Sequence, residues 1–387
     1  MENTRLRGSG PILILFALSG MAALIYEIVW YQLLQLAIGA TAISLGVLLA
    51  SFMGGLCLGA GLFARLKTRA HPLILYSCIE LGIGAFGLLL LWLLPLLDKV
   101  YFAAVAAGMP SLLLRGTLAA LCLLPPTILM GASLPAIVRF AGRGPTTWAW
   151  LYAANTMGAM SGALLAAFVL LRLFDIAVAS YAAVGINLVV AAGSWWLASH
   201  APVQDLADEG APATSELARW PIYGVIAVSG MTALGAEVVW TRLLGMLFAG
   251  TAYAFATILA VFLGGMAIGS FLSAPILRRV RPVLALGLCQ LLLAVAIGWA
   301  AWCMSKILPQ LPALYSNGWK VAGGDFLRAT YALFPATLLW GASFPLAMAA
   351  VRGSSDPARQ VGRIYAANTL GGIAGSISHT VMLVTLG

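Results

Sequence analysis

The sequence predicts an all-α membrane protein that crosses the bilayer many times and is built from two parallel repeats of about six helices. Only 9% of its 387 residues are charged, against roughly 25% in a soluble domain. Hydrophobic residues make up 62%, and the mean hydropathy is +1.00. Motifs of the first half also recur about 210 positions later. The composition excludes a soluble enzyme, a secreted disulfide scaffold and a disordered chain.

Eleven apolar runs are long enough to be helices of roughly 20 residues that span a bilayer. In the first half they cover about 11–37, 41–64, 72–95, 112–139, 148–171 and 176–198. In the second half they cover about 220–247, 251–275, 282–305, 327–350 and 363–386. These runs predict a repeat at 1–198, a cytoplasmic acidic linker at 199–219 and a second repeat at 220–387. A counterpart of the helix at 176–198 is missing from the second repeat.

Basic residues are distributed unevenly between the two sides of the predicted bundle. With the N-terminus inside, fourteen lie in inner segments and six in outer segments, and Arg242 remains within a span. Cytoplasmic loops of membrane proteins are enriched in Lys and Arg. The sequence therefore predicts a cytoplasmic N-terminus, and the net charge of +9 requires no nucleic-acid partner.

The internal repeat is visible as paired motifs. SGMAALIYEIVWYQLL begins at Ser19 and SGMTALGAEVVWTRLL at Ser229. A GAS-x-Pro motif occurs at 131 and 341, and YAANT at 152 and 365. An even number of spans per repeat gives both halves the same orientation, with an axis along the membrane normal. The two halves of major-facilitator transporters are related in this way.

These motifs also carry a family resemblance. The pattern SG..AL.YE.VW..LL, followed by F..GL.LG, GAS.P and Y.ANT.G, resembles the membrane region of bacterial proteins that fuse a major-facilitator-like transporter to a spermidine synthase. The resemblance covers nearly the whole chain. It implies a bacterial inner (plasma) membrane location and a connection with polyamines.

The fused proteins also carry an aminopropyltransferase-like domain, which needs a glycine-rich nucleotide loop after a strand. The Gly-Gly pairs at 54, 264 and 371 lie within apolar spans instead. We therefore predict neither enzymatic activity nor a cofactor for this chain, although a longer protein can carry such a domain. Three histidines without an HExxH motif or a cysteine cluster argue against a metal site.

Glu27 and Glu237 are the main candidate site residues. They are repeat equivalents, and ionisable residues within a span are functional candidates by default. In a major-facilitator-like arrangement they can face each other across a central cavity and hold a small cation or a coupling proton. The alternative is that each carboxyl group is a polar latch, hydrogen-bonded to a neighbouring helix.

Four further candidates lie close to these carboxylates in sequence. Trp30 and Trp240 follow three residues later, on the same helix faces, where an indole ring attracts ammonium groups. Their alternative roles are packing or an interfacial aromatic belt. Tyr26 adds a ring in the first half only, and Arg242 can neutralise Glu237.

Two other candidates are weighed mainly as structural residues. Glu80 corresponds to Gln290 in the second repeat, and an uncharged equivalent favours a hydrogen-bonding role. His379 lies in the last span opposite the small Ala166, and a lone histidine is a weak signal for proton relay.

Small and amide residues in the spans are interpreted as packing groups. Asn155 and Asn368 are expected to form hydrogen bonds between helices, because polar side chains link helices in lipid. Small-xxx-small motifs let helices approach closely. Gly55 and Gly59 form one such motif, and Gly265 and Gly269 form its repeat counterpart.

Three functions remain open from the sequence. The first is transport of a small cationic, polyamine-type metabolite by alternating access of the two halves. The second is a membrane anchor or substrate-feeding module of a spermidine-synthase-like enzyme. The third is a non-transporting subunit of a membrane complex. The expected partners are the lipid bilayer, a small cation or protons, and a membrane-protein partner or a second copy of the chain.

Overall fold

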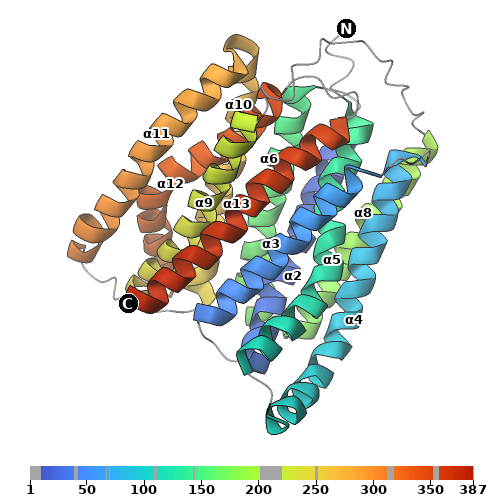
Figure 1. The fold of residues 1–387 in the computed structure, drawn as a ribbon, viewed down its shortest axis with the longest axis vertical. Coiled ribbons are helices and arrows are strands. Elements are labelled where there is room, and N and C mark those ends of the chain that lie inside the picture. Colours follow the sequence, from blue (N-terminus) through green and yellow to red (C-terminus); the bar gives the residue numbers. More distant parts are fainter. Residues whose placement is uncertain are drawn as a thin grey trace.

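The computed structural model describes residues 10–38, 42–66, 68, 70–108, 111–142, 144–200, 220–248, 252–311, 318–351 and 357–386. Within these ranges the secondary structure is entirely helical. The helices form one elongated bundle, with α4 and α8 at one edge and α11 at the other (Figure 1).

The helices follow the predicted order. The first half contains α2 (Gly10–Ile38), α3 (Ala42–Phe63), α4 (Pro72–Ala106), α5 (Ser111–Ala141), α6 (Pro145–Leu165), the π-helical segment η1 (Ala166–Leu170), α7 (Leu171–Leu173) and α8 (Ile176–His200). The second half contains α9 (Trp220–Leu247), α10 (Ala252–Arg279), α11 (Pro282–Trp302), the π-helical η3 (Cys303–Ile307), the 3-10 segment η4 (Leu308–Gln310), α12 (Gly318–Ala350) and α13 (Pro357–Leu386). The predicted linker at 199–219 lies outside the described residues, except for its boundary at α8.

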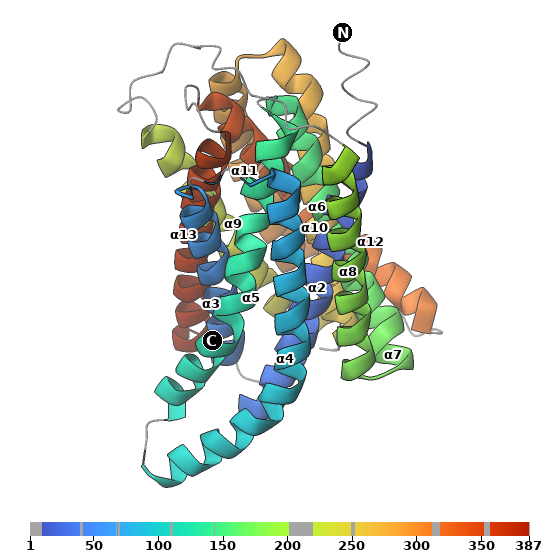
Figure 2. The same ribbon diagram turned by 90° about the vertical axis from the view of Figure 1, so that its right-hand side faces the viewer.

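Each of the eleven predicted spans corresponds to a helix, but α4, α12 and α13 are longer than predicted by six residues or more, α13 because it begins at Pro357. The span predicted at 72–95 continues to Ala106, so α4 has 35 residues and a length of about 52 Å. Its last turns extend beyond the other helices together with the first turns of α5 (Figure 2). Helix α12 begins at Gly318, before the predicted 327, and its first turns hold an ion pair between Asp325 and Arg328 at 3.8 Å.

Nine of the helices in the described ranges are long and apolar enough to cross a membrane. The other two are α3, which contributes the shorter apolar segment Ala50–Phe63, and α13, whose early turns carry Arg359 and Arg363. The chain is thus a multi-pass membrane protein, as its composition predicts.

The two halves contact each other reciprocally. Within the halves, α3 packs against α5 and α2 against α6, and the equivalent pairs are α10 with α12 and α9 with α13. Between the halves, α3 packs against α13 and α10 packs against α6. Helix α10 is the repeat of α3, and α13 is the repeat of α6. Each of the two contacts is therefore the repeat-related counterpart of the other. An interface with a twofold axis has this property.

Glycines set the spacing of the paired helices, at equivalent places in both halves. A Cβ atom at Gly55 would collide with the Thr127 hydroxyl group, and one at Gly265 with the Thr337 hydroxyl group. A Cβ atom at Gly59 would collide with the Ile128 carbonyl oxygen. Gly269 faces the carbonyl oxygen of Leu338 in the same way. Helix pairs α3–α5 and α10–α12 therefore touch backbone to backbone, as the small-xxx-small motifs predict.

Candidate functional site

A central cavity lies between the two halves, with a volume of about 220 Å³. The first half contributes residues of α2, α3, α4, α5, α6 and α8, and the second half residues of α9, α10 and α13. The polar members of the lining are Ser19, Glu27, Ser133, Tyr152, Asn155, Thr156, Asn187, Glu237, Tyr365, Asn368 and Thr369. The described residues that line it include no lysine, arginine or histidine.

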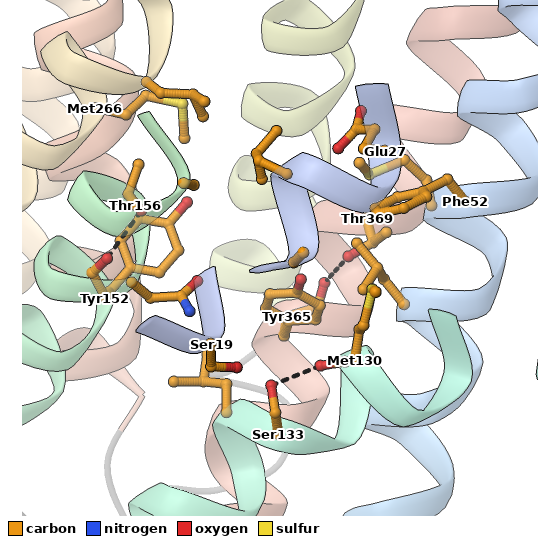
Figure 3. Close-up of a pocket in the computed structure, with 18 of the residues that line it drawn as sticks. Ser19, Glu27, Phe52, Met130, Ser133, Tyr152, Thr156, Met266, Tyr365 and Thr369 are labelled. Atoms are coloured by element: carbon orange, nitrogen blue, oxygen red, sulfur yellow. Dashed lines mark hydrogen bonds between the residues drawn. The ribbon is translucent and has the colours of Figure 1, made fainter. Parts of the chain in front are cut away.

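Glu27 of α2 and Glu237 of α9 both line this cavity, so the structure brings the two repeat-related carboxyl groups to one space. They are partly exposed to the cavity and interact electrostatically with each other. Neither forms a hydrogen bond or an ion pair with another described residue. Figure 3 shows Glu27 in the wall of the cavity with Tyr365 and Phe52 nearby. In this geometry neither carboxyl group is a latch, because a latch would be bonded to a neighbouring helix.

Two tyrosines that the site prediction did not include also line the cavity. Tyr152 of α6 and Tyr365 of α13 are the first residues of the repeated YAANT motif. The Phe344 ring lies between them, with its centroid 4.6 Å from that of Tyr152 and 5.8 Å from that of Tyr365. The sequence signal that pointed to these tyrosines was the YAANT motif, which is identical over five residues in two equivalent helices.

Both paired asparagines lie at the cavity, and Asn155 also links two helices. The Asn155 side-chain amide of α6 donates a hydrogen bond to the Phe16 carbonyl oxygen of α2 at 3.0 Å, as expected for a link between helices. Asn155 and Asn368 also line the cavity. The hydroxyl groups of Thr156 and Thr369 donate instead to the carbonyl oxygens four residues earlier in their own helices, at 2.8 Å and 2.6 Å.

The aromatic candidates lie behind the cavity wall and do not line it. The Trp30 ring is stacked on Tyr26 at 5.0 Å, and both side chains are fully buried. Tyr26 in turn packs against Gly87 of α4, where a Cβ atom would meet its ring. Trp240 packs against Trp340 and Phe262, with ring centroids 5.4 Å and 6.3 Å apart. These tryptophans have the packing role that we weighed as the alternative to cation binding.

Arg242 does not neutralise Glu237. It is exposed on α9, does not line the cavity, and forms no ion pair with Glu237. Five residues along an α-helix correspond to a rotation of about 140° relative to the starting residue, so the two side chains point in different directions. The Glu237 carboxyl group therefore lines the cavity without an ion pair to Arg242.

Glu80 and His379 do not line the cavity. Glu80 of α4 accepts hydrogen bonds from the Ser19 hydroxyl group of α2 and the Asn187 amide of α8, each at 2.6 Å. His379 of α13 packs against Gly235 of α9, and its Nδ1 atom lies 2.8 Å from the Gly375 carbonyl oxygen. Gln290, the repeat counterpart of Glu80, also forms a hydrogen bond between helices, but with a different helix of the repeat: its amide donates to Ser343 of α12 at 2.9 Å.

Contacts between the halves occur on both sides of the cavity. On the side where α6 begins, the Ser270 hydroxyl group of α10 donates to the Ala149 carbonyl oxygen at 2.9 Å. On the opposite side, the rings of Tyr31 and Phe255 lie 5.6 Å apart. On either side of the cavity, α10 of the second half therefore contacts a helix of the first half: α6 on one side and α2 on the other. Among the described residues there is no group of three or more His, Cys, Asp or Glu that can hold a metal ion.

Comparison with solved structures gives the class of fold. The human organic anion transporter MFSD10 (TETRAN) matches with a TM-score of 0.62 and 15% identity, over 97% of this chain and 93% of that one. A bacterial homologue of the iron transporter ferroportin, in an outward-facing state, matches with a TM-score of 0.58 and 13% identity, over 97% and 90%. The major facilitator superfamily transporter FucP, in the outward conformation, matches with a TM-score of 0.57 and 15% identity, over 97% and 91%.

The chain thus has the fold of the major facilitator superfamily transporters, as the repeat of six-helix units predicts. No protein-family model and no curated protein matches its sequence. At identities of 13–15% the similarity defines the fold alone. The substrate has to be argued from the cavity of this chain.

Proposed function

We propose that this protein is a secondary transporter of a small organic cation, with Glu27 and Glu237 binding its positive charge or a coupling proton. The observation that carries the proposal is the cavity lining, which among the described residues has two carboxyl groups and no basic side chain. An ammonium ion and a carboxylate attract each other by about 4 kcal/mol at roughly 4 Å and an effective dielectric constant of about 20. An anion would meet only repulsion from the same groups.

The size of the cavity and the origin of its two carboxyl groups support a polyamine-type substrate. A volume of about 220 Å³ corresponds to the share of roughly seven water molecules, which is below the range typical of drug-sized ligands. One carboxyl group comes from each half, so an elongated diamine can place one amine on Glu27 and the other on Glu237. Apolar side chains such as Leu24 and Leu263 line the same cavity and suit the methylene chain between the amines.

Alternating access follows from the two-half architecture. Binding residues are supplied by both halves, and rocking of one half against the other exposes such a site to each side of the membrane in turn. The cavity favours this function over a purely structural subunit, whose halves would have no need of one. A substrate-feeding module of a spermidine-synthase-like enzyme would use the same cavity for the same class of molecule.

The experiment is uptake of labelled spermidine or putrescine into proteoliposomes. We expect Glu27→Gln and Glu237→Gln each to reduce uptake at least tenfold, because the amide keeps the size of the side chain but removes its charge. Arg242→Gln is the matched control, since it removes a charge from α9 outside the cavity. Wild-type uptake in both carboxyl variants would refute the proposal.

A further inference from the structure

A third carboxyl group, that of Glu80, lies directly behind the cavity wall. Its side chain is 0% exposed, and each of its oxygens accepts one hydrogen bond. The donors are the Ser19 hydroxyl group of α2 and the Asn187 amide of α8, both at 2.6 Å. Ser19 and Asn187 line the cavity, whereas Glu80 does not. The carboxyl group is therefore one hydrogen bond away from the substrate space, through two different helices.

Further buried polar groups lie near this carboxyl group. The buried Tyr76 hydroxyl group lies within hydrogen-bonding range of Glu80 and Ser19, whereas the buried Tyr26 hydroxyl group and the Asn187 Oδ1 atom have no hydrogen-bond partner among the described residues. Both phenols interact electrostatically with Glu80. Buried polar groups are normally paired, so the unpaired Asn187 Oδ1 atom of a residue bonded to a buried acid is a feature to be explained.

The neighbouring polar groups fit a carboxyl group that changes its protonation state. An ionised carboxylate only accepts hydrogen bonds, whereas a protonated one must also donate one. The Tyr76 hydroxyl group can donate to the ionised form, beside Ser19 and Asn187. The same hydroxyl oxygen can accept from the protonated form. Glu80 can thus take up or release a proton without leaving its own groups unsatisfied.

No fixed charge near Glu80 holds it in one state. The ionisable groups that face it are Tyr26 on α2 and Tyr76 on α4. In the described parts of α5 and α8, which pack against α4, no charged side chain interacts with it. A buried carboxylate without a cationic partner is costly. A proton is the cation that can neutralise it in the space available.

We propose that Glu80 binds the coupling proton of the transporter, at a site separate from Glu27 and Glu237. The inference rests on the proposed function of the cavity and adds the ion that drives it. The step is the reversible conversion of the carboxylate and one proton to the carboxylic acid. When Glu80 is ionised, Ser19 and Asn187 donate to it, and the Ser19 oxygen, which lines the cavity, can accept from an ammonium group. Protonation of Glu80 removes a negative charge from beside the cavity, so proton binding and cation binding oppose each other.

Infrared difference spectroscopy on the purified protein tests proton binding without requiring transport. We expect a carbonyl band of a protonated carboxylic acid that titrates with pH, is lost in Glu80→Gln and persists in the Glu27→Gln, Glu237→Gln double variant. Asn187→Leu, which removes one hydrogen bond from the carboxylate, should change the pH midpoint of that band, and it keeps the test available if Glu80→Gln does not fold. A titrating band that is unaltered by these changes at 80 and 187 would overturn the proposal.

Transport assays then test the coupling. Glu80→Gln fixes the uncharged state at this position. Exchange of labelled for unlabelled polyamine should therefore weaken and lose its dependence on pH, and uptake driven by a pH gradient should fall at least tenfold. Gln290→Ala is the control, because it removes the bond to Ser343 at the repeat-equivalent position, where no ionisable group is present. Gradient-driven uptake at the wild-type level in Glu80→Gln would contradict proton coupling at this residue. If no variant and no wild-type protein moves polyamine, the cation proposal fails, while the infrared result still decides whether Glu80 binds a proton.

Discussion

The close approach of α3 and α5 allows a sharp test within a single helix. Gly59 and Gly61 are two residues apart in α3, and both have helical backbones. A Cβ atom at Gly59 would collide with the Ile128 carbonyl oxygen, which is backbone and cannot rotate away. A Cβ atom at Gly61 would have nothing within 4 Å. The substitutions Gly59→Ala and Gly61→Ala add the same methyl group to two contrasting environments.

We expect Gly59→Ala to be destabilised by about 1–3 kcal/mol or more, because α3 and α5 must separate over a contact that has no soft side chain to yield. Gly61→Ala should be neutral or more stable by roughly 0.5–1 kcal/mol, because alanine restricts the backbone of the unfolded chain more than glycine does. Thermal unfolding of both variants in the same detergent measures the difference. Equal melting temperatures for the two variants would refute the reasoning. Gly269→Ala, which meets the Leu338 carbonyl oxygen, should repeat the loss in the second half.

Three further substitutions separate packing from binding. Trp240→Ala should cost about 3–5 kcal/mol in stability while leaving the KM for polyamine unchanged, because the ring packs on Trp340 and not on the cavity; a raised KM in thermostable protein would assign the indole to the substrate. Arg242→Gln should leave uptake unchanged, and a large fall in uptake would place this arginine in the cation site after all. Asn155→Ala should lower both the melting temperature, by roughly 1 kcal/mol of unfolding free energy, and the uptake rate, because it removes a link from α6 to α2 and a polar group from the cavity; full activity with full stability would contradict both roles.

The fold was predictable because the features that determine it can be read directly along the sequence. Span length and apolar composition gave the eleven helices, and the 210-residue repeat gave their grouping into two halves. The extension of α4 to Ala106 was not predictable from hydropathy. Polar residues such as Asp98 and Lys99 favour a loop by composition, whereas a helix beyond the apolar core keeps its backbone hydrogen bonds regardless.

The site was predictable only where chemistry and symmetry agreed. Glu27 and Glu237 were found because a carboxyl group within a span is rare and the repeat pairs them. Tyr152 and Tyr365 were missed because tyrosine is common in spans, and only the packing of α6 and α13 decides which face is turned inward. Trp30 and Trp240 were predicted as site candidates but lie behind the cavity wall, for a related reason. A residue three positions away lies on a neighbouring part of the helix surface, but the adjacent helices determine whether that surface is cavity or core.

Equilibrium binding of diamines tests the central claim most directly. Calorimetric titration of the purified wild-type protein with putrescine, and with a monoamine of the same chain length, measures whether both charges are recognised. We expect the diamine to bind more tightly to the wild type, each of Glu27→Gln and Glu237→Gln to weaken its binding at least tenfold, and the preference over the monoamine to disappear in both variants. Undiminished diamine affinity in the double variant would contradict the account.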